Sequence, residues 1–269
     1  MKLRIAAARE GIDWLRSGAR AFARQPVALI GLPLMLAALL AFAGMLPLAG
    51  PLLALALLPA GTVGLMEAAR QATQGRFPSP AVLLTALRAA PQSVRQILLL
   101  GLLYALCGAA VQGLTRLLLG EPPDMTALQE LTAEKLADPA LMAQARAALR
   151  YNLGQLLLFA PLSLAFWHAP ALTHWHGVPP VKSLFFSVMA VLHNWRAFTL
   201  YGLASAALLA GATLALTVLL ALLALLGAPA LAAHGVLLLG LAMAAIFSAS
   251  VWFSFCGCFE GAQEAADAS

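Results

Sequence analysis

Histidine and cysteine side chains gather near the ends of two apolar segments, where they could bind a metal ion. The candidate ligands are His168, His174, His176, Cys256 and Cys258. Imidazole and thiolate groups are ligands that zinc and copper prefer. Residues two apart on a helix point about 200° apart, so His174 and His176 converge only if residues 173–180 form a loop. The alternative, which we favour, is that the histidines are interfacial side chains beside Trp167 and Trp175. We expect no metal and no other cofactor.

Two glutamates, Glu67 and Glu260, lie at the ends of apolar segments rather than in their middles. A charge at the centre of a bilayer costs about 3 kcal/mol or more, so it is typical of pumps and transporters. The absence of a central charge disfavours a proton- or sodium-driven pump. We expect both glutamates to have a structural role, either at a helix end or in an ion pair with each other, with Arg70 or with arginines of the interfacial helices. A substrate or proton site is the alternative.

The chain that positions these groups is too apolar for a water-soluble fold. Its 269 residues are 62% hydrophobic and 10% charged, with a mean hydropathy of +0.89. Soluble domains carry about 25% charged residues, so a water-soluble enzyme is excluded. The sequence holds no catalytic Ser/His/Asp grouping, phosphate-binding glycine loop or zinc-protease motif. We expect no enzymatic role and no nucleic-acid partner.

Six apolar segments are long enough to cross a bilayer, which takes about 20 residues each. They cover residues 27–46, 48–66, 97–119, 153–172, 198–226 and 231–259. The sequence therefore predicts an all-α integral membrane protein with a single membrane domain, 1–269. Residues 120–152 form an insertion on the outer side, in which Thr126 and Gln129 make a capping box. Asp138 and Pro139 begin a second short helix of that insertion.

Lysine and arginine are distributed unevenly between the two sides of these segments. Most of the 16 lie before the first segment, between the second and third, and between the fourth and fifth. Because basic residues are enriched in cytoplasmic loops, we expect both termini to face the cytoplasm of a bacterial inner membrane.

Internal similarity divides the chain into three units, 1–75, 79–177 and 180–265. Prolines and glycines match in register, as Pro59 does with Pro161. Each unit would consist of an amphipathic interfacial helix followed by a transmembrane hairpin. The alternative is that a sequence rich in Ala, Leu and Gly aligns with itself by chance.

Arginines at the cytoplasmic side are candidates for contact with lipid headgroups. They are Arg16, Arg20 and Arg24 in the first amphipathic helix, and Arg95 and Arg196 before later segments. We expect that helix to lie in the interface plane, with its apolar stripe in the acyl region. Each basic residue near an anionic leaflet contributes about 1 kcal/mol. The alternative to a specific headgroup site is simple anchoring.

Small residues recur every four positions on two segments, a spacing that favours close packing of membrane helices. They are Ala60 and Gly64 on the second segment, and Ala207, Gly211 and Ala215 on the fifth. Ser163, Thr213 and Ser250 could form hydrogen bonds between helices. Alternatively, these three hydroxyls line a polar cavity between the repeats.

Several local motifs point to a known family. They are Arg9-Glu10-Gly11 and Trp14-Leu15 within residues 2–26, the hairpin 47–51 and Pro59-Ala60-Gly61. On these motifs the chain resembles a family of proteobacterial multi-pass inner-membrane proteins that has no assigned activity. The helix-then-hairpin unit is more distantly similar to membrane domains fused to bacterial glycerophosphodiester phosphodiesterases. This sequence lacks their catalytic domain, so the resemblance implies neither that activity nor any catalytic residue.

These observations favour a non-enzymatic structural or accessory protein of the inner membrane. It would bind anionic lipid headgroups at the cytoplasmic face, and dock to a membrane-protein partner or form a homo-oligomer. The alternative is a passive transporter or carrier of lipid or a small apolar compound. Its substrate would pass through a cavity between the repeats, lined by Ser163, Thr213 and Ser250.

Overall fold

The computed structural model describes residues 2–123, 139–225 and 230–267, without the side chains of 223–225 and 230–234. Nearly all of this part of the chain is helical. Its elements are β1 (Lys2–Leu3), α1 (Glu10–Arg24), α2 (Pro26–Gly44), α3 (Gly50–Thr73), η1 (Pro80–Leu87), α4 (Pro91–Leu119), α6 (Pro139–Phe166), α7 (Ala169–His176), α8 (Pro180–His193), α9 (Trp195–Leu225), α10 (Ala230–Cys258), β2 (Phe259–Glu260) and α11 (Ala262–Asp267).

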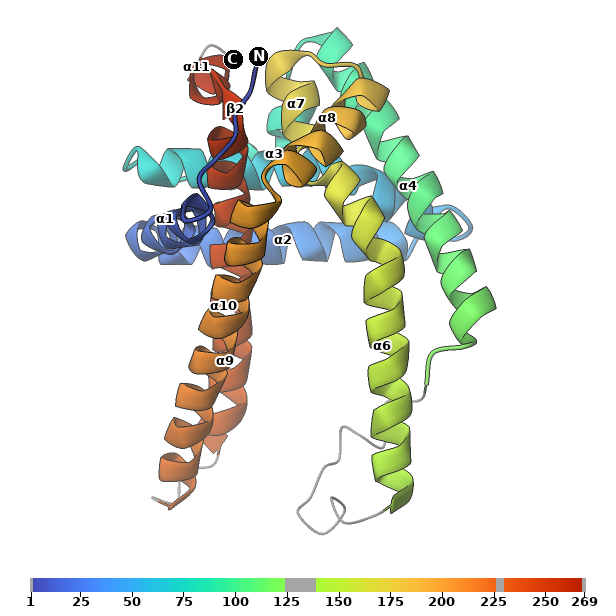
Figure 1. The fold of residues 1–269 in the computed structure, drawn as a ribbon, viewed down its shortest axis with the longest axis vertical. Helices are drawn as coiled ribbons and strands as arrows, with labels where there is room; N and C mark the ends of the chain where they lie inside the picture. The colour runs from blue at the N-terminus through green and yellow to red at the C-terminus, as the bar shows by residue number, and fades with distance from the viewer. Residues whose placement is uncertain (1, 124–138, 226–229, 268–269) are drawn as a thin grey trace.

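Six helices in the described part of the chain are long and apolar enough to cross a membrane. Their existence confirms the predicted all-α multi-pass fold. The six helices do not share one direction. Figure 1 shows α9, α10 and α6 along the long axis of the molecule, whereas α2 and α3 run across it.

Both chain termini lie at the same end of the molecule (Figure 1). There β1 and β2 pair antiparallel, with Lys2 opposite Glu260, and the Arg4 amide donates a hydrogen bond to the carbonyl of Cys258 at 2.8 Å. We call this end the head; it comprises α1, α3, η1, α7, α8, α11, the two strands and residues 245–258 of α10. Residues 206–222 of α9 and 235–244 of α10 extend away from it side by side, and we call them the leg (Figure 1).

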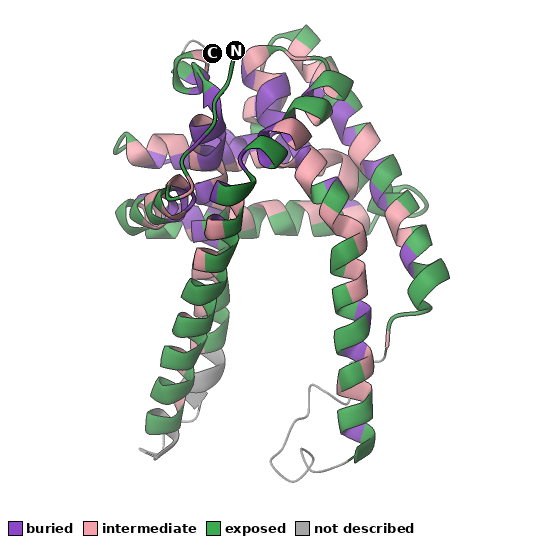
Figure 2. Ribbon diagram, viewed as in Figure 1, coloured by how far each residue is buried: buried purple, intermediate pink, exposed green. Residues whose placement is uncertain are grey.

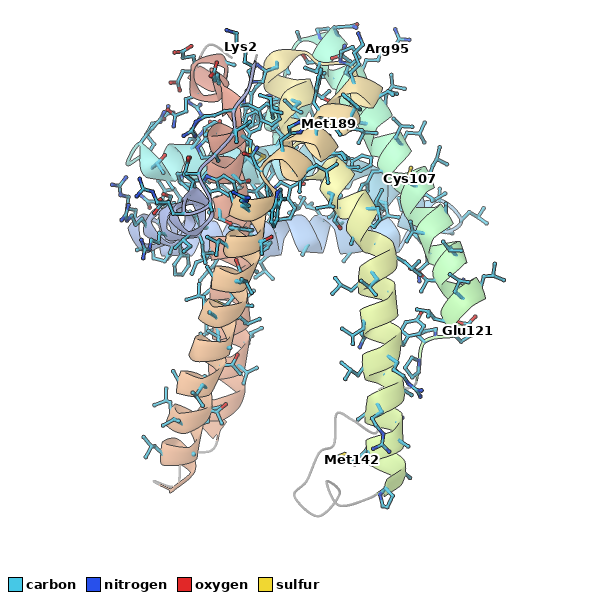
Figure 3. All side chains as sticks on the ribbon, viewed as in Figure 1. Lys2, Arg95, Cys107, Glu121, Met142 and Met189 are labelled. Carbon is cyan, nitrogen blue, oxygen red and sulfur yellow. The ribbon has the colours of Figure 1, made fainter. Side chains whose placement is uncertain are left out.

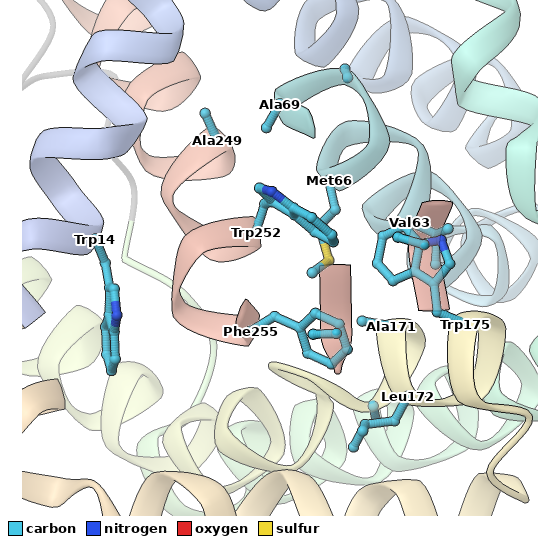
Figure 4. Packing of buried hydrophobic residues seen from close by; sticks show 14 of the residues in the cluster. Trp14, Val63, Met66, Ala69, Ala171, Leu172, Trp175, Ala249, Trp252 and Phe255 are labelled. Carbon is cyan, nitrogen blue, oxygen red and sulfur yellow. The ribbon is translucent and has the colours of Figure 1, made fainter. Parts of the chain in front are cut away.

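The hydrophobic core lies in the head (Figure 2). Its largest buried side chains include Trp252 and Phe255 near the end of α10, and Phe259 of β2. The ring of Trp175 from α7 lies 5.1 Å from that of Trp252 in an edge-on arrangement, and Met66 of α3 lies beside them in Figure 4. Aromatic pairs of this geometry add to the stabilisation from buried area, so α10, α7 and α3 form one packed unit.

The predicted amphipathic helix at the N-terminus is present as α1, but its apolar stripe packs against protein. Trp14, Leu15 and Gly18 are buried. A Cβ atom on Gly11 would lie 1.9 Å from the Ala197 carbonyl oxygen of α9, and one on Gly18 would lie 2.7 Å from the Ile246 carbonyl oxygen of α10. The backbone of α1 therefore approaches two helices closely, and the prediction that its stripe lies in the acyl region was wrong.

Two boundaries of the fourth segment also differ from the prediction. Helix α6 runs without a break from Pro139 to Phe166, so there is no separate short helix at residues 139–149. The helix then breaks at Trp167 and His168, because Pro170 has no N–H to continue the hydrogen-bond pattern. The free amide of His168 donates instead to Ser187 Oγ at 3.0 Å. Thr126, Gln129, Asp138 and the turn at 227–229 lie outside the described residues.

The order of elements repeats in the chain. A short helix, α1, η1 or α8, precedes two long ones in each of the ranges 1–75, 79–177 and 180–265. The second short helix has 3-10 geometry, unlike the other two. The evolutionary relationship of the three units stays a prediction.

Candidate functional site

A buried ion pair lies near the C-terminal end of α3. Glu67 is 6% exposed, and its carboxylate accepts hydrogen bonds from Arg70 at 2.7 and 2.8 Å and from the Gln71 amide at 2.8 Å. Arg70 also bonds the Asp267 carboxylate of α11 at 2.5 Å. The predicted pairing of Glu67 with Arg70 is therefore confirmed. Glu260 instead lies exposed on β2, opposite Lys2.

A polar pocket of about 680 Å³ opens beside this ion pair. Its lining comes from α3, the connection to η1, η1 itself, the beginning of α4 and α7. The residues are Glu67, Arg70, Gln71, Arg76, Ser79, Ala81, Val82, Thr85, Arg88, Ala89, Ala90, Ser93 and His174. Three guanidinium groups thus meet at one cavity, which we call the arginine pocket.

The charges around the arginine pocket are unequally compensated. Arg70 bonds two carboxylates, whereas within the described ranges the Arg76 side chain donates a hydrogen bond only to the neutral amide oxygen of Gln74. No acidic group within the described ranges forms an ion pair with Arg76 or Arg88. Two positive charges therefore remain available to an anion, and guanidinium groups suit carboxylates and phosphates.

The candidate metal ligands do not form a cluster. His168 is fully buried, with its Nε2 atom 3.1 Å from Ser254 Oγ. His174 and His176 lie in the last turn of α7, so residues 173–176 are helical rather than a loop. Cys256 and Cys258 are free thiols at the end of α10. Within residues 2–123, 139–225 and 230–267, no three His, Cys, Asp or Glu side chains are placed to hold a metal ion.

Four of the five predicted headgroup arginines form no side-chain hydrogen bond to any group in the described part of the chain. Arg16 lies 3.7 Å from Asp13, and Arg196 lies over the Trp195 ring at 5.4 Å. Arg20 and Arg95 are exposed, and Figure 3 shows Arg95 at the head end. Arg24 differs, because it donates a 2.6 Å hydrogen bond to the Thr73 carbonyl at the end of α3, where a cation complements the helix dipole.

The two small-residue ridges behave differently. Ala60 and Gly64 are buried in α3, and a Cβ on Gly64 would lie 2.7 Å from the Leu83 Cα atom of η1. Ala207, Gly211 and Ala215 are exposed on α9, and Gly211 has no atom within 4 Å of its Cβ position. The prediction that this second ridge holds the chain's own helices together was wrong, since no described helix covers it.

The three candidate hydroxyls do not share a cavity. Ser250 is fully buried and lies 2.6 Å from the Tyr201 hydroxyl. Ser163 is exposed on α6 and bonds its own helix at the Phe159 carbonyl, and Thr213 is exposed on the leg. The polar cavity between repeats that these residues were expected to line is therefore not formed by them.

In the sequence analysis, several pocket residues served only to predict which side of the membrane each connection faces. Arg76 and Arg88 counted as basic residues between the second and third segments, and Ser93 drew no attention. The cluster of Arg70, Arg76, Arg88 and Arg95 in one connection was the available signal. Asp267 and Asn194 were missed as well, because their partners lie far away in sequence: Asn194 Oδ1 accepts the Ala6 amide at 2.6 Å.

Comparison with known proteins gives one full-length match. A probable inner membrane protein of Burkholderia thailandensis is 34% identical to this chain over 269 residues, covering 98% of this chain and 96% of that protein. No protein-family model matches the sequence. No solved structure matches it either.

Proposed function

This chain belongs to the family of the probable inner membrane protein of Burkholderia thailandensis, and from that premise we propose that it is a non-enzymatic accessory or structural protein of the bacterial inner membrane. In this proposal its head binds anionic lipid at the cytoplasmic face. The leg docks to a membrane-protein partner or to a second copy of the chain. The distant similarity to membrane domains of glycerophosphodiester phosphodiesterases stays a prediction that this match does not test.

One observation carries the proposal: charge and exposed apolar surface are separated along the chain. Arg16 and Arg20 are exposed on α1 in the head, and Arg95 is exposed near the start of α4 at the same end of the molecule (Figure 3). Between Arg196 and Glu260 the sequence holds no other Asp, Glu, Lys or Arg. The most apolar window of α9 has none of its residues buried. Such a division suits a basic surface among anionic headgroups and an uncharged surface among acyl chains or partner helices.

The proposed orientation places both termini in the cytoplasm, since the head is the basic end. Alkaline phosphatase and green fluorescent protein fused to the C-terminus test it in cells. We expect a fluorescent protein that folds and a phosphatase that stays inactive. An active phosphatase would place the head outside and overturn the proposal.

Lipid binding is tested on protein extracted into polymer nanodiscs with its surrounding membrane. We expect phosphatidylglycerol to be enriched around the protein relative to the bulk membrane. The double variant Arg16→Gln/Arg20→Gln should reduce this enrichment. Equal lipid composition in the nanodiscs and in the bulk membrane would contradict lipid binding at the head.

Docking is tested by mass measurement in a mild detergent. We expect a defined homo-oligomer or a stoichiometric partner, because the ridge at Ala207, Gly211 and Ala215 permits close helix approach. Gly211→Leu should dissociate the assembly. Gly240→Leu is the matched control, since Gly240 is also exposed with no atom within 4 Å of its Cβ position. A partner-free monomer of the unmodified protein would contradict docking.

A further inference from the structure

The arginine pocket has a composition suited to one anionic group rather than to a diffuse charged surface. Glu67 is fully engaged with Arg70 and Gln71, so it does not neutralise Arg76 or Arg88. These two guanidinium groups carry up to ten N–H donors, and in the described part of the chain only one hydrogen bond, from Arg76 to Gln74, uses any of them. An anion in the pocket would supply the missing acceptors.

Neutral donors line the same pocket. Ser79 and Ser93 belong to its lining, and within the described ranges neither hydroxyl donates a hydrogen bond. The Nδ1 atom of His174 is buried and has no hydrogen-bond partner there. Arginine pairs combined with hydroxyls are typical of sites for phosphate, which has several acceptor oxygens.

The N-terminus of α4 adds to this positive potential. Its N-cap residue, Ala90, gives no side-chain hydrogen bond to the first turn, so the amides of Gln92 and Ser93 are uncapped. The partial positive charge of a helix N-terminus favours an anion. Since Ala90 and Ser93 both line the pocket, this helix end and the arginines act on the same space.

An apolar groove continues from the pocket along α4. It has a volume of about 620 Å³, and its lining consists of the apolar residues Leu87, Ala89, Pro91, Val94, Leu98, Leu99 and Leu102 together with Arg95. Ala89 belongs to both the groove and the pocket, so the two are contiguous. A phosphate site joined to an apolar groove matches a molecule with a charged head and a hydrocarbon chain.

We propose that the arginine pocket binds the phosphate of an anionic phospholipid whose acyl chain lies in the groove along α4. This inference rests on the proposed lipid-binding function and assigns it a site. Arg76 and Arg88 hold the phosphate oxygens, and Ser79 and Ser93 donate further hydrogen bonds. Leu98 and Leu102 contact the chain.

The test measures lipid binding to the full-length protein by native mass spectrometry in detergent. Phosphatidylglycerol, phosphatidic acid and phosphatidylcholine with the same acyl chains are added separately. We expect one anionic lipid to bind about tenfold or more tightly than phosphatidylcholine. The double variant Arg76→Gln/Arg88→Gln should lose this preference, because each charge-assisted contact to phosphate is worth about tenfold or more.

The matched control is Arg146→Gln/Arg150→Gln, which removes the same charge at two exposed positions of α6, outside both the pocket and the groove. We expect this control to retain the single tight lipid. Thermal unfolding of each variant checks that it is folded, and Arg88→Lys, which keeps the charge, should retain part of the affinity. If the pocket variant binds as tightly as the unmodified protein, the site assignment is wrong.

Two further outcomes separate the sources of failure. Glycerol 3-phosphate and inorganic phosphate are added as competitors; if millimolar amounts displace the lipid, the pocket recognises free phosphate and the lipid assignment is overturned. If the unmodified protein shows no preference for anionic lipid, the proposed function fails together with the site. If it does prefer anionic lipid but only the Arg16→Gln/Arg20→Gln variant loses that preference, the proposed function stands and the pocket assignment fails.

Discussion

The head and the leg are both made of apolar helices, yet only the head buries its side chains. Half of the most apolar window of α3 is buried, compared with none of the corresponding window of α9. The two regions also differ in amino-acid composition. Residues 206–222 and 235–244 contain no aromatic residue, whereas residues 245–259, at the end of α10 and the start of β2, contain five aromatic residues and three serines.

This difference shows what packs membrane helices together. Lipid chains are as apolar as leucine, so helices gain little from hiding leucines against each other. The helices of the head are held together by close packing and by polar contacts instead. Trp167 Nε1 donates to Ser254 Oγ at 3.1 Å, and the backbones of α1 and α10 meet at Gly18. Apolarity makes the leg compatible with a bilayer, but it leaves residues 206–222 and 235–244 exposed or only half-buried.

The largest effect is expected from removing a core ring of the head. Trp252→Ala should lower the free energy of unfolding by about 3–5 kcal/mol, because it leaves a large cavity. Unfolding of the purified protein in detergent by heat or denaturant measures it. Leu219→Ala in the exposed leg should change stability by less than about 0.5 kcal/mol. Similar losses for both variants would abolish the distinction between head and leg.

The second effect concerns the buried ion pair. Arg70→Ala should destabilise the head by about 3 kcal/mol, since it leaves the Glu67 carboxylate buried without its charged partner. The double variant Glu67→Gln/Arg70→Gln should recover part of the loss. The same unfolding measurement applies, and a double variant less stable than Arg70→Ala would argue against this explanation.

The third effect compares two glycines. Gly11→Ala should cost about 1–3 kcal/mol, because the new methyl group collides with the Ala197 carbonyl. Gly211→Ala in the leg should be neutral or stabilising by up to about 1 kcal/mol, since alanine favours helix. Melting temperatures of the two variants give the comparison, which fails if Gly11→Ala melts like the unmodified protein.

The smallest effect concerns two hydroxyls. Ser250→Ala removes the bond to the Tyr201 hydroxyl in the head and should cost about 1 kcal/mol. Thr217→Ala removes a bond that stays within its own helix in the leg and should cost less than about 0.5 kcal/mol. Equal losses would mean that contacts between helices contribute no more than local ones.

The sequence predicted the helices better than their partners. Run length and hydropathy located all six long helices, because these properties belong to each segment alone. Helix spacing also identified the apolar stripe of α1, of which Leu15 is buried. Helix spacing could not predict what this stripe packs against, since an apolar helix face can contact either lipid or protein. Ala207, Gly211 and Ala215 have the same spacing as Ala60 and Gly64, yet only the latter two meet a neighbour.

The candidate site was even harder to predict from the sequence than the helix contacts. Glu67 and Arg70 are three residues apart on one helix, so their pairing follows from helix geometry. The pocket depends on bringing Arg76, Arg88 and His174 together from separate elements. That arrangement comes from the turn after α3, the 3-10 helix and the break before α7, which no periodicity in the sequence specifies.

Spin-label accessibility in liposomes tests the contrast between head and leg most directly. Labels are placed singly at Arg20 in the head and Leu214 in the leg, in a variant without the three native cysteines. We predict that Leu214 is accessible to oxygen but shielded from a water-soluble nickel reagent, and that Arg20 shows the reverse. Free access of the nickel reagent to Leu214, or oxygen-dominated relaxation at Arg20, would contradict the account.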